Sequence, residues 1–88
     1  MKESAHTLAI VILPAARQAL RRIPANPAKR ILGKITDLAT DPASAAYTVT
    51  VLRGRSGIRL RVGDWRVIME DGEVLEVVQV GPRGGIYE

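Results

Sequence analysis

Arginines in the second half of the chain are the residues best suited to chemistry. Residues 53–66 contain five arginines and a single acid, whereas residues 70–76 contain four acids and no base. Arg83 and Tyr87 follow farther along. A guanidinium fork matches a phosphate through two hydrogen bonds, and a phenol can stack on a base or take part in proton transfer. This stretch therefore predicts a surface that binds the phosphates of RNA.

The composition agrees with an anionic partner. The 88 residues carry a net charge of +4, with 47% hydrophobic and 25% charged residues. Residues 1–88 are therefore expected to form a single domain with one modest core and a preference for nucleic acid or an acidic protein. The chain has no cysteine, and its one histidine, His6, and its scattered carboxylates lack the spacing of metal ligands. We expect no disulfide, no metal ion and no cofactor.

The longest apolar run near the start, Leu8 to Leu13, is much shorter than the roughly 20 residues of a membrane-spanning helix. Lys2 precedes it as in a signal peptide, but the run ends at Pro14 and continues into Arg17 without a small-residue cleavage site. We therefore expect a cytoplasmic protein with no membrane partner.

The first half of the chain predicts a strand and then a helix. The stretch from His6 to Leu13 is continuously apolar and β-branched, which is typical of a strand covered on both faces. Pro14 suits the first turn of a helix, and Pro24 ends it. Its narrow apolar stripe consists of Ala16, Leu20 and Ile23, with Arg17, Arg21 and Arg22 on the solvated side.

A second helix is predicted to begin at Asn26 and Pro27 and to stop at Asp41-Pro42. Its apolar stripe consists of Ile31, Ile35 and Leu38, broadened by Leu32 and Ala39, while Lys29, Arg30, Lys34 and Asp37 mostly face water. The two helices should form an antiparallel hairpin that buries its apolar face on a sheet.

The second half predicts antiparallel strands: Tyr47–Val51, Ile58–Val62, Trp65–Met69 and Val74–Val80. Gly63-Asp64 fits a two-residue hairpin turn with glycine first, and Asp71-Gly72 is a second hairpin signal. The expected class is α+β, with an N-terminal strand, a helical hairpin and then antiparallel strands in one twisted sheet that carries the helices on one face. A two-residue turn at Asp71-Gly72 would place Glu76 on the same face as the core residue Trp65. Either that turn is longer, or Glu76 lies at a solvent-exposed edge of the sheet.

A two-residue turn at Gly63-Asp64 also groups the arginines. Arg61 would pair with Arg66, so that Arg59, Arg61 and Arg66 share the face opposite the core side chains. The last strand would return Arg83 to the same end of the sheet, with Tyr87 free to fold over the cluster. Two readings stay open: a phosphate site, or a solvated face with a tyrosine that anchors the tail. Trp65 falls in the core alternation and is read as a core residue more than as a base-stacking platform.

The second half also resembles a known family, the RelE/ParE superfamily of type II toxins, with its RelE-like branch favoured. The resemblance covers nearly the whole chain and rests on these residues: Leu52, Gly54, Gly57, Arg59, Arg61, Gly63, Asp64, Trp65, Arg66, Val67, Ile68, Val80, Gly81, Arg83 and Tyr87. It implies a toxin held inactive by a small, acidic antitoxin that wraps it, with operator DNA as a further contact through the antitoxin.

The resemblance also implies an activity and roles. The RelE branch cuts messenger RNA in the ribosomal A site without a metal, and its catalytic positions fall on Arg59, Arg66, Arg83 and Tyr87. Three arginines would stabilise the phosphate as the ribose 2′-OH attacks it, and Tyr87 would be the general base or would orient the nucleotide. Arg53, Arg55 and Arg61 are the expected RNA-binding residues.

The chain departs from the RNase branch at four positions: Gly57 and Pro82 replace basic residues, and Gly84-Gly85 replaces a charged pair. Two alternatives therefore accompany the nuclease: a DNA gyrase inhibitor of the ParE type, and a binding module that acts only in an antitoxin complex.

Overall fold

The computed structural model describes residues 8–45 and 48–85. His6, Tyr47 and Tyr87 lie outside the described residues. In chain order the elements are β1 (Ala9–Ile12), α1 (Pro14–Arg22), α2 (Ala25–Thr40), the 3-10 helix η1 (Pro42–Ala45), β2 (Val49–Val51), β3 (Ile58–Val62), β4 (Trp65–Asp71) and β5 (Val74–Pro82).

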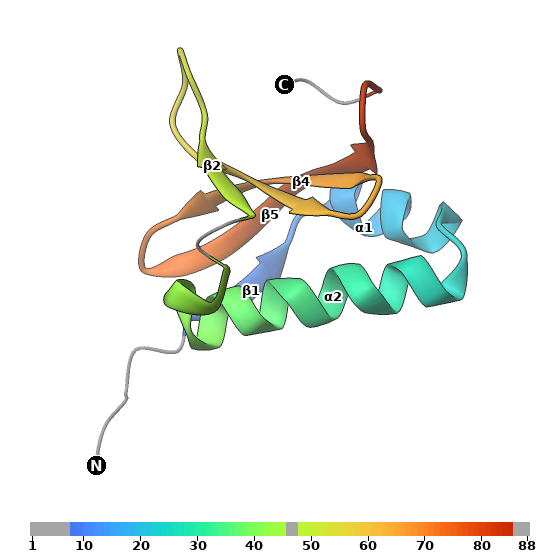
Figure 1. Ribbon diagram of the computed structural model, residues 1–88, viewed down its shortest axis with the longest axis horizontal. Helices are drawn as coiled ribbons and strands as arrows, with labels where there is room; N and C mark the ends of the chain where they lie inside the picture. The colour runs from blue at the N-terminus through green and yellow to red at the C-terminus, as the bar shows by residue number, and fades with distance from the viewer. Residues whose placement is uncertain (1–7, 46–47, 86–88) are drawn as a thin grey trace.

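The strands form one sheet of order β1-β5-β4-β3-β2. β1 runs parallel to β5, and the other neighbours are antiparallel. Figure 1 shows both helices on one side of this sheet, with α2 crossing beneath it. The predicted α+β fold with helices on one face is confirmed. No helix of residues 8–45 and 48–85 has the length and apolar character needed to cross a membrane.

The helices form where the prolines and apolar stripes predict them, with two differences. Pro14 occupies the first turn of α1, and Ala16 is buried. α2 begins at Ala25, so Asn26 lies inside the helix, and no side chain caps its start. The helix thus begins before the predicted start at Asn26 and Pro27, because Pro24 already provides the non-helical residue before the first turn. Leu32 is 40% exposed and does not broaden the buried stripe.

The core lies between the helices and one face of the sheet. Ile31 and Ile35 of α2 meet the fully buried Leu60, Val67 and Val77 of the central strands. Completely burying a side chain of this size contributes about 1.5–3 kcal/mol. Since this face supplies the core, the opposite face of the sheet, called the open face below, is left for polar side chains.

β1 is an edge strand, which corrects the prediction that it is covered on both faces. Ile10 and Val11 are 37% and 40% exposed. A short apolar run is typical of a buried strand, but it does not show which neighbours flank it. The strand is only four residues long, and the Arg17 guanidinium donates to the Ile12 carbonyl at 3.3 Å. A short strand with a charged side chain on its edge resists pairing with other chains.

The β3–β4 hairpin has the predicted register. Val62 pairs with Trp65, Arg61 with Arg66, and Arg59 with Ile68. Gly63 has φ +58°, as expected for a glycine at the first central position of a tight hairpin turn. The side chains of Arg59, Arg61 and Arg66 therefore share the open face, because opposing residues of a ladder point to the same side.

The β4–β5 hairpin explains the place of Glu76. Asp71 pairs with Leu75 and Glu70 with Glu76, so the connection is longer than two residues. The register then shifts between Ile68 and Met69, where β5 carries an extra residue. The longer turn puts Glu76 opposite Glu70 on the open face, and the irregularity returns Val80 to the core face opposite Val67. The first of the two alternatives from the sequence is therefore correct.

Candidate RNA-phosphate site

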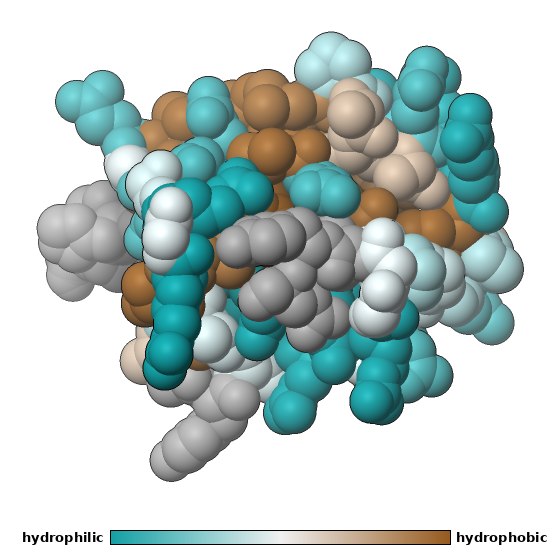
Figure 2. Space-filling model, turned by 90° about the horizontal axis from the view of Figure 1, so that it is seen from above, coloured by the Kyte–Doolittle hydropathy of each residue, from teal (hydrophilic) through white to brown (hydrophobic). Residues whose placement is uncertain are grey.

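The open face carries arginines around a small apolar patch. Leu52 and Ile68 are buried in this patch, and Val78 packs beside them. Figure 2 looks onto the open face, where hydrophilic side chains border an apolar strip. Arg61 is exposed and Arg59 is half-buried, so the cations stand at the surface above the ladder.

The side chain of Arg66 is held beside the β3–β4 turn by two backbone carbonyls of neighbouring residues. Its Nη1 donates to the carbonyls of Gly63 and Trp65, at 3.0 Å in both cases. The turn thus fixes where the guanidinium lies. Arg61 stands directly opposite Arg66, and like charges at such a pair cost a few tenths to about 1 kcal/mol. A bound anion would relieve this repulsion.

Arg83 reaches the same turn from β5. Gly81 pairs with Arg66 and Pro82 with Trp65, and the Arg83 N–H then donates to the Asp64 carbonyl at 2.7 Å. The backbones of Arg61, Arg66 and Arg83 therefore lie at one end of the β3–β4 hairpin, and these three residues are called the turn cluster below. This arrival of Arg83 at the arginines agrees with the sequence analysis. Tyr87, the fourth expected catalytic residue, lies outside the described residues.

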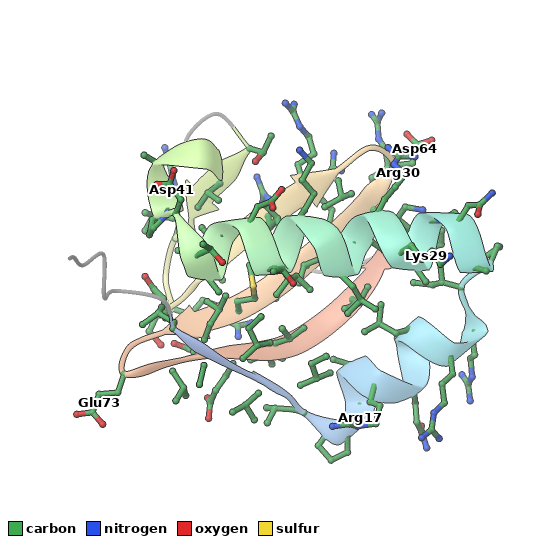
Figure 3. The ribbon with its side chains drawn as sticks, turned by 90° about the horizontal axis from the view of Figure 1, so that it is seen from below. Arg17, Lys29, Arg30, Asp41, Asp64 and Glu73 are labelled. Atoms are coloured by element: carbon green, nitrogen blue, oxygen red, sulfur yellow. The ribbon has the colours of Figure 1, made fainter. Side chains whose placement is uncertain are left out.

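Arg30 is a cation at this turn that the sequence did not reveal. A Cβ built on Gly63 would lie 3.1 Å from its Nη2, and Figure 3 shows Arg30 of α2 beside Asp64. The helical pattern assigned Arg30 to solvent. No signal in the sequence could find this neighbour, because it depends on how α2 crosses beneath β3 and β4.

Arg53 and Arg55 lie away from the turn cluster. Both are exposed in the loop between β2 and β3, at the other end of β3, and the strand alone spans about 13 Å. The loop closes through Leu52 N–H to the Gly57 carbonyl at 3.1 Å, and the Ser56 hydroxyl donates to Glu70 at 3.0 Å. The structure therefore does not group these two arginines with Arg66 and Arg83, and their RNA-binding role stays a prediction.

Gly57 has a structural reason to lack the basic side chain of the RNase branch. Its φ is +110°, and an added Cβ would lie 2.6 Å from the Met69 carbonyl oxygen. The loop approaches β4 so closely that only glycine fits without a backbone shift. The departure at this position thus follows from the path of the loop.

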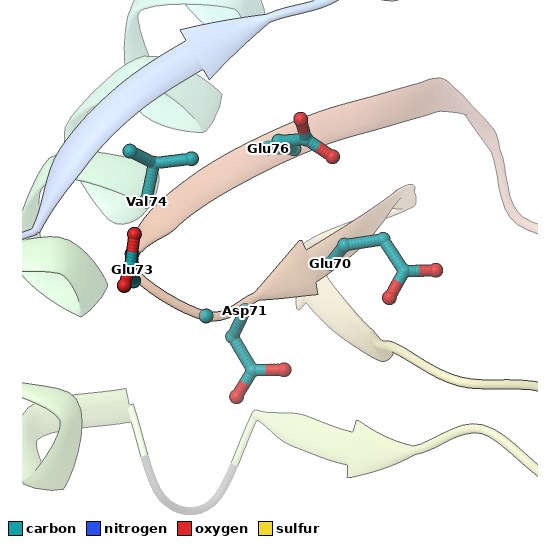
Figure 4. A pocket seen from close by; sticks show the side chains of 6 residues that line it. Glu70, Asp71, Glu73, Val74 and Glu76 are labelled. Carbon is teal, nitrogen blue, oxygen red and sulfur yellow. The ribbon is translucent and has the colours of Figure 1, made fainter.

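The acidic residues gather at the opposite end of β4 and β5. Glu70, Asp71, Glu73 and Glu76 line a shallow depression at the β4–β5 turn (Figure 4). Within the described part of the chain, no three His, Cys, Asp or Glu side chains are placed to hold a metal ion. The open face therefore has a basic end at the β3–β4 turn and an acidic end at the β4–β5 turn.

Comparisons with solved structures agree with this fold. The archaeal RelE-RelB complex from Pyrococcus horikoshii OT3 has a chain 26% identical, with a TM-score of 0.76, covering 91% of this chain and 99% of that one. The RelBE2 complex from Mycobacterium tuberculosis has a chain 18% identical, with a TM-score of 0.73 and coverage of 88% and 99%. A mutant of the E. coli toxin RelE in the free state is 19% identical, with a TM-score of 0.69 and coverage of 90% and 86%. No curated protein matches the chain.

The fold, together with a family match over most of the chain, defines a toxin of the RelE/ParE superfamily, as the resemblance in the sequence predicts. Residues 10–87 match the model of the "ParE toxin of type II toxin-antitoxin system, parDE". The chain belongs to this family.

Proposed function

We propose that this toxin is an endoribonuclease that cuts messenger RNA in the ribosomal A site and so inhibits translation in the cytoplasm. The observation that carries the proposal is the turn cluster: Arg61 of β3, Arg66 of β4 and Arg83, which directly follows β5, all lie at one turn. Three arginines at one turn suit a phosphate better than they suit fold stability, since Arg61 and Arg66 repel each other across the ladder.

In the proposed reaction, the ribose 2′-oxygen attacks the adjacent phosphorus while the bond to the 5′-oxygen of the next nucleotide breaks. The products are a 2′,3′-cyclic phosphate and a free 5′-hydroxyl. The 2′-OH proton passes to a base, for which Tyr87 is the candidate, and the leaving 5′-oxygen gains a proton. The nucleophile belongs to the substrate, so the reaction as proposed uses no metal ion and no cofactor.

The arginines stabilise the charge that develops on the phosphate. Arg66 is preorganised, because two backbone carbonyls hold its guanidinium, and a donor fixed in advance costs no reorganisation as the charge develops. Arg83 approaches the same phosphate from the end of β5, and Arg59 acts farther along β3. Arg61 binds the RNA backbone beside them, with Arg53 and Arg55 contacting it at the other end of β3.

The proposed inhibitor is a cognate antitoxin, small and acidic, that wraps the toxin and covers the turn cluster. The similar complexes from Pyrococcus horikoshii and Mycobacterium tuberculosis support such a partner. An acidic partner fits the net charge of +4, because carboxylates replace RNA phosphates at the arginines. Through this antitoxin, the pair would also contact operator DNA.

A second candidate function is inhibition of DNA gyrase by protein contact. It is favoured by the ParE family match and by the absence of basic side chains at Gly57 and Pro82.

Controlled expression with messenger RNA end mapping and a gyrase supercoiling assay separates the two. The nuclease predicts new 5′ ends within codons, growth arrest, unchanged supercoiling, and loss of both arrest and cleavage when Arg83 and Tyr87 are changed to Ala. Arg21→Ala, on the exposed side of α1, is the matched charge control and should stay toxic. Arrest that survives the double change, or lost supercoiling with intact messenger RNA, refutes the nuclease.

A further inference from the structure

An apolar groove lies on the helix side of the sheet. It is at the same end of β4 and β5 as the turn cluster, but on the opposite face of the sheet. It has a volume of about 230 Å³ and is lined by Ala19, Arg22, Ile23, Trp65, Val80, Gly81 and Pro82. The last turn of α1 forms one wall, and the ends of β4 and β5 form the other. Trp65 packs against the core yet is only partly buried, so its ring is part of the groove surface.

The polar groups of the groove are donors. Trp65 provides an indole N–H and Arg22 provides a guanidinium, and neither side chain has a hydrogen bond or ion pair in the part of the chain described. The remaining lining side chains are apolar or absent. A ligand that fits must therefore bring an apolar group for the walls and an acceptor, preferably a negative charge, for Arg22.

These requirements favour an acidic peptide over a nucleobase. The Watson–Crick edge of every base presents donors beside acceptors, and no lining side chain offers an acceptor to pair with those donors. An ionised carboxylate only accepts hydrogen bonds, which suits the donors of the groove. A neighbouring side chain such as leucine would fill its apolar space. Charge also favours an acidic peptide. Arg22 lies at the groove, and Arg83 and Arg66 of the turn cluster lie at the same end of the sheet, so a peptide that crosses this end meets positive charge on both faces.

We propose that this groove binds an acidic peptide segment of the toxin's partner through one apolar side chain, with the adjacent carboxylate on Arg22. A segment anchored here and continuing past Pro82 reaches Arg83, the next residue of the chain. The groove thus anchors the partner in a position from which its acidic residues can cover the turn cluster. The inference rests on the proposed inhibition by an acidic antitoxin, but not on the RNA cleavage.

The test uses the single tryptophan of the chain, which gives one indole N–H signal in a ¹⁵N-labelled sample of the full protein. The probe is the amide of N-acetyl-leucyl-glutamate, titrated into the millimolar range. The amide of N-acetyl-leucyl-glutamine removes only the charge, and the amide of N-acetyl-glycyl-glutamate removes only the apolar side chain. We expect the leucyl-glutamate peptide to give a saturable shift of the indole signal. The leucyl-glutamine peptide should bind about two- to fivefold more weakly, and the glycyl-glutamate peptide should give no shift.

Two variants locate the effect. Arg22→Gln should remove the preference for glutamate over glutamine, whereas Arg21→Gln, its neighbour on α1, should keep it. Ala19→Leu fills the groove and should abolish the shift. Thermal unfolding of each variant shows that it is folded.

The proposal is overturned if the leucyl-glutamate probe causes no shift of the indole signal. It is also overturned if the preference for glutamate over glutamine is unchanged in Arg22→Gln. A short single-stranded RNA that moves the indole signal in an Arg22-dependent way, with no shift from the dipeptide, makes the groove a nucleotide subsite instead. Each result is independent of messenger RNA end mapping, so failure here and failure of the nuclease are distinguishable.

Discussion

Arg66 is the arginine of the turn cluster whose place the backbone fixes most directly. Both carbonyls that hold it, Gly63 and Trp65, belong to the turn and its first strand residue. Its alternation with Val67 and its pairing with Arg61 could be predicted from the Gly63-Asp64 signal. The carbonyl contacts could not, because they depend on a side-chain rotamer.

Arg66→Ala should lower the rate of messenger RNA cleavage about 10²–10³-fold, the range for removing one preorganised donor from a developing oxyanion. Arg66→Lys keeps the charge without the planar fork, so its cleavage rate should lie between those of Arg66→Ala and the unchanged protein. The measurement is the cleavage rate on programmed ribosomes, with urea unfolding as the check on stability. Arg21→Ala should match the unchanged protein in both assays. Equal rates for Arg66→Ala and the unchanged protein would exclude Arg66 from the reaction.

At the scale of elements, hairpins differed in how well the sequence predicted them. The β3–β4 register follows from one glycine and strict alternation, and it is confirmed. The β4–β5 register does not follow, because a longer turn and an extra residue in β5 each change the pairing without any required residue type. The edge position of β1 likewise depends on strand order, which an apolar run does not encode.

The loop between β2 and β3 is seated on β4 at Gly57. Gly57→Ala adds a Cβ 2.6 Å from the Met69 carbonyl at a φ of +110°, so the loop must move or the strand must shift. We expect the free energy of unfolding to fall by about 1–3 kcal/mol, measured by urea denaturation. Gly72→Ala is the matched control, since its Cβ would meet nothing within 4 Å, and it should cost less. Equal losses would show that the close approach to Met69 is not what requires glycine.

At the scale of the whole molecule, charge is divided along the open face. The turn cluster lies at one end, and Glu70 and Glu76 face each other across the ladder at the other. A phosphate backbone is attracted to the first end, whereas at the second the carboxylates oppose the attraction of Arg53 and Arg55 in the adjacent loop. The sequence predicted both charge groups, but their placement at opposite ends of one face required the strand pairing.

Neutralising the acidic end should tighten RNA binding. Glu76→Gln together with Glu70→Gln should raise the affinity for single-stranded RNA about two- to fivefold, with the gain shrinking as salt screens the charges. Glutamine retains an oxygen that can accept from Ser56, so the loop contact can persist. Fluorescence anisotropy at low and high salt measures the effect, with Glu73→Gln at the turn tip as the control for net charge. An unchanged or weaker affinity would mean that the RNA never approaches this end.

The short β3–β4 turn also limits how this protein can vary in length. Side chains alternate along a strand, so inserting or deleting one residue within the β3–β4 hairpin would slip its register, turning side chains of the core toward water and cations toward the core. Such a change would remove the fold and the site together, however conservative its chemistry. The loop from Arg53 to Ser56 is exposed, and length changes there leave that ladder intact. Working variants of this toxin should therefore differ in length at the β2–β3 loop and keep two residues between Val62 and Trp65.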